Sequence, residues 1–116
     1  MRDLQFIDLP VGMGRRVTVL QRVQKINREL PAEPVIVICP ANMAMVWQDY
    51  LRRFGVKGEV VSYQRARRYC VDVQYKVEQN PSILVLDEPK MYMTGRVTRE
   101  AIAPIIVAAE HVLILN

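Results

Sequence analysis

Two glycines followed by two arginines form the first group of residues that could do chemistry. Residues 9–18 are LPVGMGRRVT, with an apolar run before them and a helical pattern after them. A glycine turn that opens a helix lets backbone N–H groups converge on phosphate oxygens, and the helix dipole adds a favourable field. We therefore take Gly12, Met13, Gly14, Arg15 and Arg16 as candidates for binding the phosphates of a nucleotide. A simple strand-to-helix turn is the alternative, because short glycine motifs recur by chance.

An acidic doublet, Asp87-Glu88, is the second group. It comes directly after the apolar run ILVL at 83–86. Two carboxylates at a strand end can coordinate Mg²⁺ and help to activate an attacking water. Asp87 and Glu88 are therefore the candidate catalytic residues, and Asp87 is the candidate metal ligand. Ordinary solvated acids at a strand end are the alternative.

Short apolar runs alternate with amphipathic stretches along the whole chain, which indicates βαβ units and a parallel sheet. The expected strands are 4–9, 35–39, 58–63, 82–88 and 111–116. Four helices are expected: one from Arg16, one from an Asn42 cap to a stop at Gly55, and two that cover 64–79 and 97–109. The predicted fold is an α/β three-layer sandwich with a mainly parallel five-stranded sheet.

Three details of the helices follow from residue spacing. Trp47 shares a helical face with other aromatic residues, which predicts that it packs helix onto sheet rather than serving as a surface anchor. Tyr69, Val73 and Val77 are expected on one face of the 64–79 helix. Pro104 should delay the start of the last helix or kink it.

Both candidate groups fall at the carboxyl ends of predicted strands. In an open parallel sheet these ends share one rim, where ligands bind. We therefore expect the glycine turn and the acidic doublet to lie side by side.

Five sequence blocks in this order resemble the first RecA-like lobe of a superfamily-two helicase, of the Swi/Snf-type remodelling ATPase branch. The family pattern DEMGLGKT corresponds to LPVGMGRR at 9–16, CPxxLxxxWxxExxxF to CPANMAMVWQDYLRRF at 39–54, and SYxxLRR to SYQRARR at 62–68. The family's DEAH corresponds to DEPK at 87–90, and its final strand before TGTP corresponds to LILN at 113–116. Together the blocks span nearly the whole chain.

The resemblance implies a P-loop NTPase lobe with a strand order of about 3-2-4-5-1, and ATP and Mg²⁺ as ligands. Residues 1–116 would form a single N-terminal ATPase lobe, with the second lobe absent. The resemblance implies that in the family the second lobe supplies arginine fingers, and such an arginine raises the rate of hydrolysis about 10³–10⁵-fold. We therefore expect little ATP hydrolysis by this chain alone, and a separate second lobe is a candidate partner.

The chain departs from the family pattern at the catalytic positions. Arg15 stands where the family has its phosphate-binding lysine, and a planar guanidinium does not substitute for a compact ammonium. Arg16 replaces the hydroxyl residue that helps to hold Mg²⁺, and a cation there would repel the metal. Thr18 is two residues further along the helix and cannot readily take over. Lys90 stands in place of the family's final histidine.

The chain carries a formal net charge of +4, which leans mildly towards an anionic partner. Arg65, Arg67 and Arg68 follow a block that in the family lies near the DNA path. They are candidate DNA contacts, with a solvated helix face as the alternative. A non-enzymatic module that binds DNA or a protein is the alternative function, and self-association of an exposed lobe face into a homo-oligomer is a third.

The apolar runs are too short to span a bilayer, and the N-terminus lacks a signal-peptide pattern. We expect a cytoplasmic or nucleoid-associated protein that is not secreted and has no membrane partner. Cys39 and Cys70 are expected to be reduced thiols, since no further cysteine suggests a metal site.

Overall fold

The computed structural model describes residues 3–7, 14–29, 34–79 and 83–115, and for 3–7, Glu29 and Gln79 it describes the backbone alone. The described strands are β1 (Asp3–Ile7), β2 (Val35–Cys39), β3 (Gly58–Ser62), β4 (Ile83–Asp87) and β5 (His111–Leu115). They form one sheet in the order β1-β5-β4-β2-β3, and every pair of neighbours is parallel. The parallel α/β architecture expected from the sequence is confirmed.

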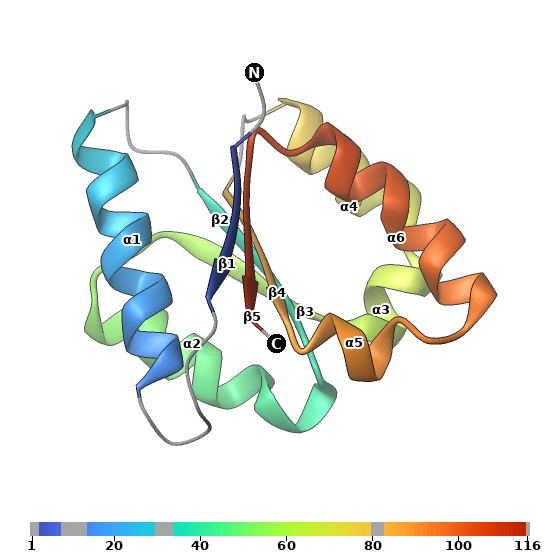
Figure 1. The fold of residues 1–116 in the computed structure, drawn as a ribbon, viewed down its shortest axis with the longest axis horizontal. Helices are drawn as coiled ribbons and strands as arrows, with labels where there is room; N and C mark the ends of the chain where they lie inside the picture. The colour runs from blue at the N-terminus through green and yellow to red at the C-terminus, as the bar shows by residue number, and fades with distance from the viewer. Residues whose placement is uncertain (1–2, 8–13, 30–33, 80–82, 116) are drawn as a thin grey trace.

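Helices cover both faces of this sheet (Figure 1). On one side lie α1 (Arg15–Glu29), the short 3₁₀ helix η1 (Ala41–Met43) and α2 (Ala44–Arg53). On the other lie α3 (Tyr63–Arg68), α4 (Cys70–Gln79), the single turn α5 (Pro89–Tyr92) and α6 (Arg96–Ala108). The three layers follow from the central strands, which are apolar on both faces and must be covered twice.

Two buried clusters hold the layers together, one on each face of the sheet. Alternate residues of β4 divide between them: Ile83 and Val85 face the α1–α2 side, whereas Leu84 and Leu86 face the α3–α6 side. Every side chain of β2 and β4 is buried. The fold therefore places the ends of these two strands, and whatever chemistry they carry, next to the close-packed core.

The helix expected over 64–79 is in fact two helices, so this expectation is wrong. The Ser62 hydroxyl caps α3 by accepting a hydrogen bond from the Arg65 N–H at 3.1 Å. The helix then ends at Tyr69, whose ψ of 37° lies outside the α-helical range. Tyr69 is 44% exposed while Val73 and Val77 are buried, so the three do not share a face.

Two further expectations about helix ends need correction, and one is confirmed. Asn42 does not cap α2, because it lies inside η1, and neither η1 nor α2 has a side-chain cap. α6 begins at Arg96 and runs through Pro104, so of the two effects expected of this proline the late start does not occur. Gly55 ends α2 as expected: its φ is +64°, and its N–H donates to the Arg52 carbonyl.

Candidate functional site

The start of α1 and the end of β4 meet at the carboxyl rim of the sheet. Gly14 precedes α1 with a φ of +68°, a left-handed conformation that favours glycine. From the first turn of the helix, Arg15 Nη2 lies 3.3 Å from Glu88 Oε1, and Arg16 Nη2 lies 3.9 Å from Asp87 Oδ2. Four of the candidate residues therefore come together as two ion pairs, whereas Gly12 and Met13 lie outside the described residues.

Asp87 is the most enclosed member of this cluster. Its side chain is 1% exposed, and Oδ2 accepts a hydrogen bond from Trp47 Nε1 at 2.8 Å. Oδ1 is buried and has no hydrogen-bond partner among the described residues. Burial raises the pKa of Asp87 above its ordinary value, while the Trp47 hydrogen bond and the Arg16 charge oppose that rise. A buried carboxylate is thus held by one indole and one guanidinium.

Glu88 owes its position to an unusual backbone. It has φ 54° and ψ 52°, and it is the one non-glycine residue with positive φ in the described part of the chain. Such a conformation costs about 1–2 kcal/mol for a residue with a Cβ. Its N–H donates to the Leu115 carbonyl of β5, and its own carbonyl accepts from Met91 in α5. These bonds hold the bend that turns the Glu88 carboxylate towards Arg15.

Tyr63 supports the same rim from the opposite face of the sheet. Its hydroxyl donates to the Asp87 backbone carbonyl at 2.7 Å, and its ring stacks on Tyr92 with centroids 5.4 Å apart. Burial is the main reason that the pKa of the Tyr63 hydroxyl is raised, so the hydroxyl stays protonated as a donor. Tyr63 and Tyr92 also line a pocket of about 360 Å³, whose other lining residues are Pro40, Ala41, Asn42, Ser62 and Gln64.

Trp47 and Tyr63 are members of the site that the sequence analysis did not assign to it. Trp47 was expected in the core and is fully buried there, as predicted. A buried indole N–H usually has a hydrogen-bond acceptor, so the expected burial of Trp47 already indicated that it has a polar partner. Nothing in the sequence near Tyr63 indicates its bond to a backbone carbonyl 24 residues further along the chain.

The arrangement around Asp87 does not fit the Mg²⁺ that the family resemblance implies. Trp47 already donates a hydrogen bond to Oδ2, the positive charge of Arg16 lies 3.9 Å from the same oxygen, and the remaining oxygen, Oδ1, is buried. Mg²⁺ needs near-octahedral geometry and usually keeps several of its waters. No group of three or more His, Cys, Asp or Glu side chains that could hold a metal occurs in the described segments. Thr18 offers no ligand here either, since its hydroxyl donates to the Gly14 carbonyl.

The three arginines assigned to DNA lie on α3, away from these ion pairs. Arg65, Arg67 and Arg68 are all exposed, and within the described ranges none pairs with a carboxylate. The guanidinium carbons of Arg65 and Arg68 lie 5.7 and 5.6 Å from the centroid of the Tyr69 ring. The break between α3 and α4 thus adds an exposed aromatic ring to a cluster of three positive charges.

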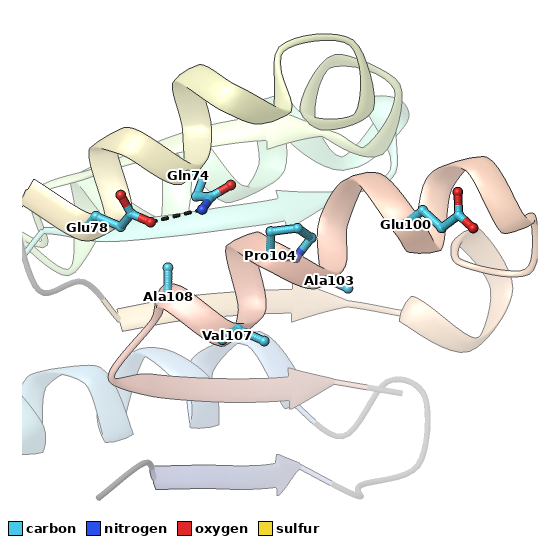
Figure 2. Close-up of a pocket in the computed structure, with 7 residues that line it drawn as sticks. All are labelled: Gln74, Glu78, Glu100, Ala103, Pro104, Val107 and Ala108. Carbon is cyan, nitrogen blue, oxygen red and sulfur yellow. Dashed lines mark hydrogen bonds between the residues drawn. The ribbon is translucent and has the colours of Figure 1, made fainter.

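A larger hollow lies between α4 and α6 and has no share in this chemistry (Figure 2). Its volume is about 510 Å³, and Gln74, Glu78, Glu100, Ala103, Pro104, Val107 and Ala108 line it. Its two acids are already engaged: Gln74 donates to Glu78 at 2.9 Å, and Arg96 pairs with Glu100 at 2.8 Å. The rest of the lining is apolar, so both carboxylates of this hollow are accounted for by these contacts.

Comparison with known proteins adds no family. The sequence matches no protein-family model, and no curated protein is significantly similar to it. Among the described residues there is no helix long and apolar enough to span a membrane. Function must therefore be argued from the rim of the sheet and from the basic surface of α3.

Proposed function

We propose that the chain is a helicase-like ATPase lobe with a degenerate nucleotide site, which binds nucleotide phosphates weakly and hydrolyses little by itself. The observation that carries this proposal is the contact between Arg15 at the start of α1 and Glu88 at the end of β4. In P-loop NTPases the phosphate-binding turn and the acidic strand end face each other across the reacting phosphate. Here the same two elements face each other with no gap between the side chains.

The strand order supports the same kinship. The sheet has the order β1-β5-β4-β2-β3, which is 3-2-4-5-1 when the strands are read from the β3 edge. This is the order that the resemblance implies for a RecA-like lobe. A left-handed glycine directly precedes α1, and a glycine turn before a helix N-terminus is a place where phosphates bind. The Swi/Snf branch remains a proposal based on the five sequence blocks. A cytoplasmic or nucleoid-associated location is part of the same proposal.

Weak binding follows from the charges at the rim. Arg15 is only 9% exposed and already pairs with Glu88, so a phosphate must displace a carboxylate to reach it. A site with a Kd of about 1 mM would still add about 1 kcal/mol of stability at about 5 mM ATP. That corresponds to a rise in melting temperature of about 4 °C for a chain of this size.

The test compares the natural chain with the double variant Arg15→Lys, Arg16→Thr, which restores the residue types of the family motif. Melting temperature is measured with and without ATP, in EDTA and in Mg²⁺, together with phosphate release. We expect a small ATP-dependent shift in the natural chain, a larger one in the variant, and background phosphate release from the natural chain. Arg28→Lys, an exposed change near the other end of α1, is the matched control.

Two outcomes would contradict this proposal in different ways. Turnover of about 1 s⁻¹ by the natural chain alone would show an ordinary ATPase rather than a degenerate one. An absence of any ATP-dependent shift in both proteins would remove nucleotide binding. If the chain is one half of a split motor, adding a chain that carries the second lobe should stimulate phosphate release. Failure of every such lobe to do so would remove the split-motor version.

The surface of α3 favours a second candidate function, a non-enzymatic module that binds DNA. Arg65, Arg67 and Arg68 are free of carboxylate partners in the described segments, and Tyr69 offers a ring on which a base could stack. Fluorescence anisotropy with single- and double-stranded oligonucleotides at several salt concentrations tests this candidate. Arg65→Ala with Arg68→Ala should weaken binding and reduce the salt slope by about 2.

Arg52 and Arg53 provide the matched control for that experiment. They are exposed, as the α3 arginines are, but both pair with Asp49, at 2.7 and 3.0 Å. Arg52→Ala with Arg53→Ala removes the same formal charge from a different helix. An equal loss of affinity in both double variants would mean that net charge, rather than the α3 surface, binds the oligonucleotide.

A further inference from the structure

Positive charge stands at the place where a divalent cation would balance the acidic doublet. The guanidinium of Arg16 lies beside Asp87, and that of Arg15 lies beside Glu88. Two positive and two negative side chains therefore neutralise one another at the rim of the sheet. One side chain of each pair is buried, since Asp87 is 1% exposed and Arg15 is 9% exposed.

We infer that Arg15 and Arg16 take over the charge-balancing role of the metal and close the acidic doublet to divalent cations. Each guanidinium is planar, permanently charged and matched to carboxylate geometry. Unlike a bound ion, it is tethered to α1 and cannot be removed by a chelator. The pairs also tie the start of α1 to the end of β4. This inference goes beyond the proposed function, since it requires no nucleotide.

The arrangement opposes a metal ion in three independent ways. A cation at Asp87 would lie within a few ångströms of the Arg16 guanidinium, whose charge repels it. It would compete with the Trp47 N–H for Oδ2. At Oδ1 it would have to shed most of its water, because that atom is buried. Removing the charge of Arg16 relieves the first obstacle and opens space for water beside Asp87.

Trp47 supplies the measurement that tests this inference. It is the single tryptophan of the chain, and its indole nitrogen is 2.8 Å from Asp87 Oδ2. Mn²⁺ is paramagnetic, so an ion bound at Asp87 would quench Trp47 fluorescence, and excess Mg²⁺ would reverse the quenching. The natural chain should show only the weak, linear quenching of random collisions up to millimolar Mn²⁺. Arg16→Thr should show saturable quenching with at least tenfold higher Mn²⁺ affinity than the natural chain.

Three further variants make the result decisive. Arg16→Gln removes the charge but keeps a long polar side chain, so it guards against a folding defect specific to threonine. Arg28→Thr, on the exposed far end of the same helix, should behave like the natural chain. Asp87→Asn in the Arg16→Thr background should abolish the saturable quenching. Far-ultraviolet circular dichroism confirms that each protein is folded before titration.

The natural chain alone can overturn the inference, whatever the variants do. Saturable Mn²⁺ quenching that Mg²⁺ reverses would show that the doublet binds metal with both arginines in place. Folded Arg16→Thr and Arg16→Gln proteins that gain no metal affinity would also overturn it, since the arginine would then not be what excludes the ion. Because no nucleotide is present, either result leaves the ATP-binding proposal to its own test.

Discussion

Replacement of Trp47 by phenylalanine should lower the free energy of unfolding by about 3 kcal/mol. The change removes the N–H that donates to Asp87 Oδ2 at 2.8 Å and leaves an aromatic ring in the core. Both side chains are almost completely buried, so water cannot replace the lost donor. Asp87 would keep only the guanidinium of Arg16 at 3.9 Å, while Oδ1 would stay without a partner.

The magnitude has two parts. A hydrogen bond to a charged, buried group contributes about 1.5–3 kcal/mol. The smaller phenyl ring leaves part of the indole volume empty, which costs about 1 kcal/mol more when the surrounding residues relax only partly. Leu51→Val estimates the packing part separately, because it deletes one methylene group from the same helix and touches no polar group. It should cost about 1 kcal/mol.

Urea unfolding followed by circular dichroism measures these free energies, since the Trp47→Phe protein has no tryptophan fluorescence. A double-mutant cycle with Asp87→Asn isolates the contact, and its coupling energy should be at least about 1 kcal/mol. A Trp47→Phe cost no larger than that of Leu51→Val, with a coupling energy near zero, would refute the reasoning. Asp87 would then be held by something other than the indole.

Three other predictions test further features of the chain. Because burial raises the pKa of Asp87, the contribution of this residue to stability is present at acidic pH and is lost as the pH rises from about 4 through the raised pKa. Urea unfolding midpoints measured across pH 4–8 should show this loss in the natural chain and not in Asp87→Asn. Burial also raises the pKa of Cys39 to about 12, so at pH 8 iodoacetamide should modify half-buried Cys70 about a hundredfold faster than Cys39. Peptide mass spectrometry measures both rates, and equal rates would contradict this prediction. Gly55→Ala should destabilise by about 1 kcal/mol in urea unfolding, because φ is +64° and a Cβ there meets no neighbour that could offset the strain.

The sequence predicted the layered architecture because its strongest signals are local. The β-branched run at 35–39 and the apolar run at 83–86 are buried on both faces, as continuous apolar strands in parallel sheets are. From strand direction alone, the turn before Arg15 and the doublet after Leu86 had to share a rim. The structure brings Arg15 and Glu88 into contact there.

The contacts within the site could not be predicted, because they join residues far apart in the sequence. Arg15 and Glu88 are separated by 73 positions, and Trp47 and Asp87 by 40. Two local signals in the sequence do indicate the short helices near the site. Ser62 is a strong helix cap that starts α3 before Gln64, and Pro89 favours the first turn of a short helix. The capped turn ends at Tyr69, which splits the expected long helix.

The two arginines change what the rim of the sheet needs in order to stay folded. With lysine and threonine at these positions, Asp87 would lose the guanidinium at its side, so its buried charge would have to be balanced by a bound cation or removed by protonation. With arginines, the compensation is covalently part of the chain. The Arg15→Lys, Arg16→Thr protein should therefore be the less stable of the two without ligand, by about 1–3 kcal/mol, and should gain more from added ligand. A variant that is more stable than the natural chain in EDTA would mean that the arginine pairs do not stabilise this fold.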